Sequence, residues 1–307
     1  MSLHKTMLGL LLGTALLPFG AQAASTYSQT KYPVVLAHGM MGWDTMLGIE
    51  YWYQIPNDLR SNGAQVYVTQ ASGLESSEVR GEQLLKQVRE ILAISGQPKV
   101  NLIGHSHGGH SVRYVAAIIP DRIATVTTMA TPAKGAPMAD LIVNGGTGGA
   151  IGTQVIQAAG TMLNLLNGGS KKGLDVSANK SLQSLSTAGS AAFNAKFPQA
   201  LPTTACGEGA YEVNGVKYYS FAGVAQSTSA LDLLDPAVKL VALAFPKGEQ
   251  NDGFVGRCSA HVGRVIRDNY NMNHIDFMNH IFGARAADTD PKVLYRTQLN
   301  RIKLSGN

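Results

Sequence analysis

The segment Gly104-His105-Ser106-His107-Gly108 constrains the fold most, because it matches the pattern Gly-x-Ser-x-Gly. Residues Val100 to Ile103 before it are typical of a short buried strand, and Ser111 to Ala117 after it are typical of a helix. A strand, a sharp turn and a helix are the context in which this pattern holds a nucleophilic serine at a strained apex. Glycine at both ends lets strand and helix approach closely. We therefore predict that Ser106 is a nucleophile with an exposed Oγ. The alternative is a glycine-rich turn from strand to helix that binds a phosphate or only reverses the chain.

Strand-like and helix-like segments alternate around this motif. Apolar, β-branched runs predict strands at 31–37, 64–69, 123–129 and 216–223, with a strand or turn at 262–266. Helices are predicted at 77–95, 193–197, 231–245 and 275–282, with a helix or irregular structure at 51–59. This alternation implies right-handed crossovers and a mostly parallel sheet. Because nothing repeats and no linker divides the chain, we predict one α/β domain over residues 25–307.

The first 24 residues are predicted to be a secretory signal peptide. Lys5 gives a basic start, residues 7–17 are apolar, and Ala21-Gln22-Ala23 is a small-residue cleavage site, with cleavage after Ala23 or Ala24 both possible. The apolar stretch is too short to span a bilayer. The net charge of +5 is scattered along the chain, so a nucleic-acid-binding surface is not expected. We expect a soluble protein that is exported through the periplasm and secreted without a permanent membrane anchor.

An uncharged amphipathic segment at residues 151–166 lies between two glycine-rich stretches, 145–149 and 168–169. A helix that simply packs on the core is one interpretation. A mobile lid is the other, because a lid needs hinges and a face that rests on either protein or lipid. We place this helical lid or cap at about residues 132–170.

A nucleophilic serine needs a histidine base and an acid that orients it. In an α/β-hydrolase the chain order is serine, acid, histidine. His107 and His110 are too close to Ser106 in sequence to act as the base. The remaining candidates are the histidines at 261, 274 and 280 and the acids Asp232, Asp235 and Asp252. Spacing alone prefers Asp252 with His274 only slightly and leaves His261 open.

Five separated motifs make the chain closely resemble the secreted Pseudomonas-type triacylglycerol lipases. The resemblance covers Ser25 to about Gly283, and its motifs occur in the family's order. They are Tyr-Pro-Val-Val-Leu-Ala-His-Gly-Met at 32–40, Val-Asn-Leu-Ile-Gly-His-Ser-His-Gly-Gly at 100–109, Ala-Cys-Gly-Glu-Gly-Ala-Tyr at 205–211, Asn-Asp-Gly at 251–253, and Ile-Arg-Asp-Asn-Tyr with Met-Asn-His at 266–274.

The resemblance implies an α/β-hydrolase fold and a Ser106, His274 and Asp252 triad. It also implies that the backbone N–H groups of Met40 and His107 form the oxyanion hole. The expected reaction is hydrolysis of long-chain acylglycerol esters at an oil–water interface. A short-chain carboxylesterase or polyester hydrolase with the same triad is the alternative, and a noncatalytic binding protein on a hydrolase scaffold is a remote one. His38 and His105 are expected to be structural.

The two cysteines, Cys206 and Cys258, are expected to form a disulfide in an exported chain, with two buried thiols as the alternative. Closing this loop is worth about 4 kcal/mol in the chain-entropy model. The same pairing matches the family.

One structural calcium ion near the catalytic histidine is also implied by the resemblance. Its ligands map to the carboxylates of Asp235 and Asp276 and the main-chain carbonyls of His280 and Ala284, and Asp232 competes with Asp235. Carboxylate and carbonyl oxygens suit this hard cation. Many members of the family need a membrane-anchored foldase chaperone, so such a partner is expected here.

Overall fold

The computed structural model describes residues 25–40, 42, 45–46, 49–145, 149–166, 180–280 and 282–307. The predicted signal peptide, residues 1–24, lies outside the described residues. The end of the predicted lid, residues 167–170, which includes the glycines at 168–169, also lies outside the described residues.

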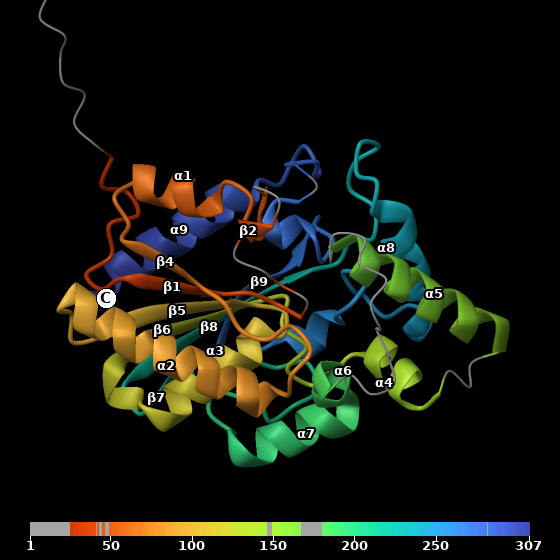
Figure 1. Cartoon of the computed structure of the whole chain (residues 1–307), viewed down its shortest axis with the longest axis horizontal. Helices are drawn as coiled ribbons and strands as arrows, with labels where there is room; N and C mark the ends of the chain where they lie inside the picture. Colours follow the sequence, from red (N-terminus) through yellow and green to blue (C-terminus); the bar gives the residue numbers. More distant parts are fainter. Residues whose placement is uncertain are drawn as a thin grey trace, which may run out of the picture.

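A seven-stranded sheet forms the centre of the molecule (Figure 1). Its order is β4-β1-β5-β6-β8-β7, and β9 also pairs with β8. Every pairing is parallel except that of β7 with β8, which confirms the predicted sheet. The strands are β1 (Val34–Ala37), β4 (Val66–Thr69), β5 (Val100–His105), β6 (Ile123–Met129), β7 (Glu212–Val213), β8 (Val216–Gly223) and β9 (Arg264–Tyr270); a separate hairpin joins β2 (Thr45–Met46) to β3 (Ile49–Glu50).

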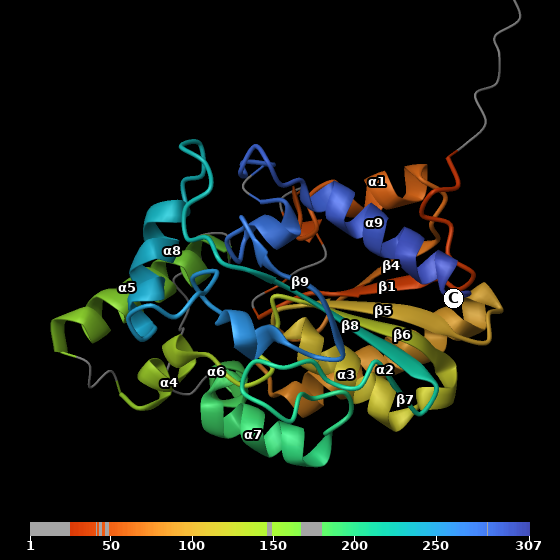
Figure 2. The same cartoon turned by 180° about the vertical axis from the view of Figure 1, so that it is seen from behind.

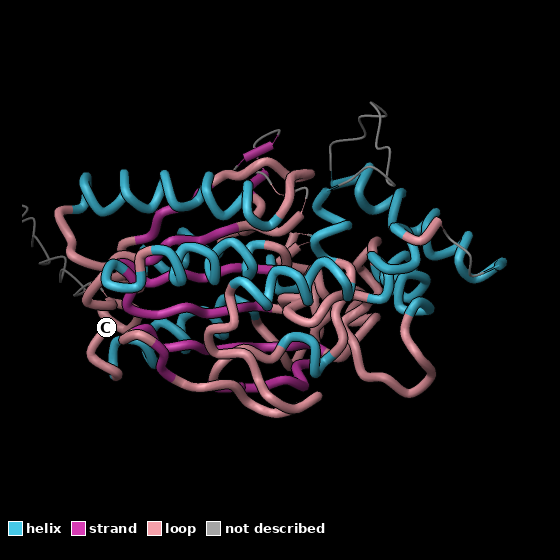
Figure 3. Tube along the Cα trace, turned by 90° about the horizontal axis from the view of Figure 1, so that it is seen from below, coloured by secondary structure: helices cyan, strands magenta, loops and turns pink. Residues whose placement is uncertain are grey.

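Helices cover both faces of this sheet (Figures 1 and 3). One face carries α1 (Ile55–Ser61) and α9 (Pro291–Leu304), and the other carries α2 (Ser77–Ser95) and α3 (Gly108–Ile118). Alternate residues of β1 explain this arrangement, because successive side chains of a strand point to opposite faces. Val34 and Leu36 join one apolar core, whereas Val35 and Ala37 join the other.

The remaining helices lie toward the end of the sheet at which β5 and β6 finish (Figures 1 and 2). They are α4 (Pro137–Val143), α5 (Gly149–Leu166), α6 (Lys180–Leu185), α7 (Thr187–Lys196) and α8 (Asp235–Val241). Helix α5 confirms the predicted amphipathic helix, and it packs against α8. Among the described helices, none is long and apolar enough to cross a membrane.

Two of the predicted helices differ from the structure. The predicted helix at 231–245 begins only at Asp235, because Asp232 Oδ1 accepts from the amide of Leu234 and makes a turn instead. It continues after α8 as a 3₁₀ turn at Ala242–Ala244. The predicted helix at 275–282 is wrong: the described part has one 3₁₀ turn, Asp276–Met278, which ends where Asn279 takes a left-handed conformation. Two other 3₁₀ turns, Pro120–Arg122 and Arg257–Ala260, were not predicted.

Candidate active site

The turn between β5 and α3 holds Ser106 in a strained conformation. Its φ is 55°, in the left-handed region that residues other than glycine seldom adopt, as expected at the apex of a strand-to-helix elbow. Both glycines of the motif are sterically required. A Cβ on Gly104 would lie 2.4 Å from the carbonyl oxygen of Gly108, and one on Gly108 would lie 2.1 Å from that of Ala37. The elbow is therefore built as the motif predicts.

Ser106, His274 and Asp252 form one hydrogen-bonded line. His274 Nε2 lies 2.9 Å from Ser106 Oγ, and His274 Nδ1 lies 2.9 Å from Asp252 Oδ2. A carboxylate only accepts, so His274 Nδ1 carries the hydrogen and donates it to Asp252. His274 Nε2 is then free to accept from the Ser106 hydroxyl.

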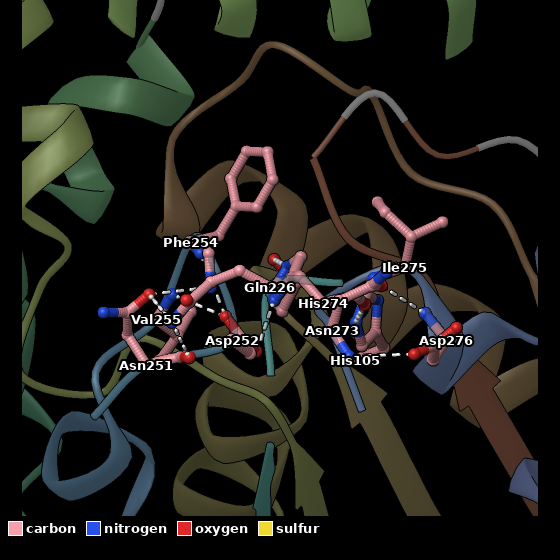
Figure 4. A network of polar contacts seen from close by, with 12 residues as sticks. His105, Gln226, Asn251, Asp252, Phe254, Val255, Asn273, His274, Ile275 and Asp276 are labelled. Carbon is pink, nitrogen blue, oxygen red and sulfur yellow. Dashed lines mark hydrogen bonds and ion pairs between the residues drawn. The ribbon is translucent and has the colours of Figure 1, made fainter. Parts of the chain in front are cut away.

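The loop of Asp252 fixes this acid next to the histidine (Figure 4). Asp252 is buried, and its Oδ1 accepts from the amides of Phe254 and Val255 at 3.0 and 2.7 Å. The amide of His274 donates to the carbonyl of Asp252 at 2.9 Å. The choice that spacing left open is thus made by geometry. His261 is engaged elsewhere, with Asp268 and the carbonyl of Gly207, both at 3.0 Å.

Ser106 faces an apolar pocket rather than open solvent. The serine is only 9% exposed, so the prediction of an exposed Oγ is wrong. Side chains of α4, α6 and the loop after Asp252 shield it. The pocket lining includes Met40, Pro132, Ala136, Met138, Ala139, Leu185, Phe254, Val255, Ile275 and Met278. None of the described residues of α5 lines this pocket.

The side chain of His107 is committed to a buried network. His110 Nε2 lies 3.2 Å from the carbonyl of Pro132 and must donate there, so its Nδ1 accepts from Ser77 Oγ at 2.9 Å. Ser77 Oγ then accepts from His107 Nε2 at 2.9 Å, which leaves His107 Nδ1 to accept from Ser181 Oγ at 2.6 Å. Burial, the largest cause, lowers the pKa of His107 well below the ordinary value. Only its main-chain N–H remains for the reaction.

The loop His38-Gly39-Met40, called the oxyanion loop below because Met40 is an expected oxyanion donor, is fixed by side chains around it. Arg80 donates to the carbonyls of His38 and Gly39 at 2.7 and 3.0 Å, and His38 Nδ1 donates to the carbonyl of Gly39 at 2.8 Å. Within the described part of the chain, the amides of Met40 and His107 have no acceptor. Both amides are therefore free to donate to an oxyanion.

Three carboxylates gather beside the catalytic histidine. The amide side chain of Asn273 donates to Asp235 Oδ1 at 2.8 Å and lies 3.4 Å from Asp232 Oδ2. Asp276 Oδ2 accepts from the amide of Asn273 at 2.8 Å, whereas its buried Oδ1 has no partner among the described residues. Burial first, and then the nearby acids, raise the pKa of Asp276 to about 7 and raise that of Asp232. A cation beside these buried acids would offset the cost of burying their charges.

The other expected calcium ligands are less distinctive. His280 Nε2 lies 2.9 Å from the carbonyl of Glu50 and donates there, so this ring nitrogen is not available to a metal ion. Ala284 is partly exposed in the loop that follows. Within the described ranges, no three histidine, cysteine or acidic side chains are arranged to hold a metal ion. The expected site thus depends on main-chain oxygens as well as carboxylates.

The predicted disulfide is present, and two unpredicted residues contact the oxyanion loop. Cys206 and Cys258 form the expected disulfide. Arg80 and Tyr51, which both contact the oxyanion loop, were not predicted. No local motif marks either residue, because each reaches the loop only through the tertiary fold.

Comparison with known proteins identifies the family of the chain. A family described as alpha/beta hydrolase fold matches residues 32–232. A triacylglycerol lipase of Vibrio cholerae is 49% identical over 285 residues, which cover 91% of this chain and 90% of the relative. The chain belongs to the triacylglycerol lipase family.

Two further members of this lipase family match over similar lengths. The triacylglycerol lipase of Burkholderia plantarii is 38% identical and covers 93% of this chain and 90% of its own length. That of Pseudomonas fragi is 37% identical, with 90% and 98% covered. A solved lipase of Bacillus licheniformis, at 20% identity, has a TM-score of 0.60 over 82% of this chain and 89% of its own, and supports the fold.

Proposed function

We propose that this chain is a secreted triacylglycerol lipase that hydrolyses the carboxylic esters of long-chain acylglycerols. The observation that carries the proposal is the unbroken line from Ser106 Oγ through His274 to Asp252, with 2.9 Å at each step. Membership of the lipase family and the apolar pocket at the serine support a lipid substrate.

The reaction follows from this arrangement. His274 Nε2 takes the proton of Ser106 as Oγ attacks the ester carbonyl, and Asp252 stabilises the imidazolium. The amides of Met40 and His107 donate to the oxyanion. His274 then protonates the leaving alcohol, which departs and leaves an acyl-enzyme. Water attacks this ester while His274 takes its proton, and the fatty acid leaves as the proton returns to Ser106 Oγ.

A series of p-nitrophenyl esters of increasing chain length, together with an emulsion of triolein, tests the substrate class. A lipase should hydrolyse triolein and accept long acyl chains, with activity that rises sharply once substrate forms an interface. Equal specific activity on monomeric and emulsified ester, with activity confined to short chains, would instead identify a carboxylesterase with a static cap.

We also propose that the acid cluster binds one structural calcium ion through Asp235 and Asp276 and the carbonyls of His280 and Ala284. The unpartnered Oδ1 of Asp276 and the mutual repulsion of three buried acids support this. When bound, the cation supplies charge neutralisation and no reaction chemistry. Asp276 lies two residues after His274, and its contact with the amide of Asn273 orients the loop that carries the base.

Export and assisted folding complete the proposal. The basic, apolar and small-residue pattern of residues 1–24 supports secretion through the periplasm. The resemblance to the secreted Pseudomonas-type lipases implies a dedicated foldase partner, and we propose one here. Expression of the mature chain with and without a coexpressed foldase tests this, because fully active enzyme without the partner would exclude the dependence.

A further inference from the structure

A line of hydrogen bonds connects the oxyanion loop to the main chain of the catalytic histidine. The amide of Gly39 donates to the phenolic oxygen of Tyr51 at 2.9 Å. Tyr51 Oη lies 2.7 Å from His105 Nδ1, and His105 Nε2 lies 3.1 Å from the carbonyl oxygen of His274. Both Tyr51 and His105 are buried. The line therefore runs through the interior, without solvent as an intermediate.

The groups at the two ends fix the direction of every bond. A carbonyl oxygen only accepts, so His105 Nε2 carries the hydrogen. The neutral ring then has a bare Nδ1, which accepts from the Tyr51 hydroxyl, while the Tyr51 oxygen accepts from Gly39. Burial lowers the pKa of His105 well below its ordinary value, which keeps this ring neutral. The tautomer of His105 with its hydrogen on Nε2 therefore satisfies every hydrogen bond from Gly39 to His274.

The residues at each step adjoin the reacting groups. Gly39 precedes the oxyanion donor Met40, His105 precedes the nucleophile, and the last acceptor belongs to His274 itself. A Cβ on Gly39 would lie 2.8 Å from Tyr51 Oη and 2.9 Å from Ser106 Cβ, so the loop rests directly on both.

The main chain of His274 is held from two sides by this arrangement. Its carbonyl accepts from His105, and its amide donates to the carbonyl of Asp252 at 2.9 Å. The imidazole rings of His105 and His274 also lie against each other, with centroids 4.7 Å apart (Figure 4).

We propose that Tyr51 and His105 are positioning residues that keep the amide of Met40 and the imidazole of His274 in register with Ser106. This inference rests on the proposed function of the triad. Oxyanion donors and base must reach the same ester carbonyl, and small misplacements of such groups lower the rate of the chemical step. The pair links the two loops that carry them.

Tyr51→Phe tests the proposal because it removes only the hydroxyl. Hydrolysis of monomeric p-nitrophenyl butyrate is measured per active site, titrated with an organophosphonate. We expect kcat to fall about 10- to 100-fold with KM within about threefold, since orientation and not binding is lost. Tyr295→Phe is the matched control: Tyr295 is also fully buried, but its hydroxyl has no partner among the described residues, so kcat should be unchanged.

Variants of His105 supply a second readout. Glutamine keeps an amide donor for the carbonyl of His274 whereas leucine does not, so His105→Gln should retain more kcat than His105→Leu. The two positions act in one line, so Tyr51→Phe combined with His105→Gln should cost no more than the worse single change.

Two results would refute the proposed positioning role of Tyr51 and His105. They are a Tyr51→Phe kcat within about twofold of wild type, or strictly additive effects in the double variant. Wild type that fails to titrate with the phosphonate would instead refute the proposed function, so the two failures are distinguishable.

Discussion

A buried arginine holds the loop that carries Met40, one of the two proposed oxyanion donors. Arg80 lies on α2, and its guanidinium also donates to the carbonyl of Ser72 at 2.7 Å. It thereby connects the loop at His38 and Gly39, which is distant in sequence, to α2 and to the segment just before α2. Arginine suits this position because its planar fork presents several donors in a fixed geometry.

We expect Arg80→Met to lower kcat on a soluble ester by about 10- to 100-fold, because the carbonyls of His38 and Gly39 lose their donor and the amide of Met40 loses its orientation. The unpaired carbonyls should also lower the free energy of unfolding by about 1–3 kcal/mol. Steady-state kinetics per titrated site and urea unfolding measure the two effects.

Arg113→Met is the control for this prediction. Arg113 is an equally buried arginine, but it donates to Asn194 and the carbonyl of Phe197, away from the oxyanion loop. The Arg113→Met variant should be less stable than the wild type and should have an unchanged kcat. Equal losses of kcat in both variants would mean that Arg80 acts on stability alone.

Buried neutral histidines make the fold sensitive to acid. Burial, the largest cause, lowers the pKa of His38 and of His110 from 6.5 to about 3. The unfolded chain therefore binds protons below pH 6.5 that the folded chain does not bind until about pH 3, so stability is lost as pH falls through this window.

His110→Asn isolates one of these groups. Each such histidine contributes about 1.4 kcal/mol of lost stability per pH unit below its unfolded pKa. We expect the fall in unfolding free energy between pH 7 and pH 5 to be about 1–2 kcal/mol smaller in the variant. Urea unfolding at the two pH values measures it, and an identical fall in both proteins would contradict the assignment.

Helix α5 and the segment before α8 form an apolar edge beside the active site. Val155, Ala158 and Ala159 of α5 are buried, whereas Ile151 is 54% exposed. Leu231 and Leu233, two residues apart in sequence, are 80% and 82% exposed. Both features suit contact with lipid.

We expect Leu231→Gln combined with Leu233→Gln to lower activity on triolein emulsion at least tenfold, since burying each leucine in lipid is worth about 1.5–3 kcal/mol. Activity on monomeric p-nitrophenyl butyrate should not change. Ile94→Gln with Leu304→Gln is the control, because these residues are similarly exposed, at 72% and 78%, on α2 and α9. Equal losses in both pairs would refute a specific lipid-facing edge.

Local sequence determines some elements and not others. The β6 strand follows from an apolar, β-branched run, and the helix α5 follows from periodic apolar residues. The elbow follows from two glycines at which a Cβ would collide with the main chain. The described part of the segment 275–282 has a similar pattern but forms only a 3₁₀ turn, because Asn273 Oδ1 accepts from the amides of Ile275 and Asp276 and makes a compact turn. Competition between a side chain and the helix is not visible in apolar spacing.

The proposed calcium site would link the stability of the molecule to a cation. We expect a chelator such as EDTA to lower the melting temperature of the wild type and to have a much smaller effect on Asp276→Asn. Asp232→Asn and Asp235→Asn, compared in the same way, distinguish the two acids. EDTA saturated with calcium is the control. An unchanged melting temperature in EDTA would refute the calcium site.

The site as a whole could be predicted in part. The chain order of serine, acid and histidine reduced the number of candidate triad residues, and the family resemblance implied His274 instead of His261. Contacts of Tyr51, Arg80 and His105 could not be predicted, since each joins segments that the sheet topology alone brings together. His107 illustrates the difference: its main-chain role follows from the motif, whereas the network that occupies its ring needs Ser77 and Ser181.

Covalent labelling by an organophosphonate tests the central claim most directly. Ser106 lies 2.9 Å from His274 Nε2 and should react as a nucleophile, so the intact protein should gain one phosphonyl group that maps to the peptide containing Ser106. Ser106→Ala should gain none and should lose esterase activity. A folded wild type that does not label, or a Ser106→Ala variant that still labels and hydrolyses ester, would contradict the account.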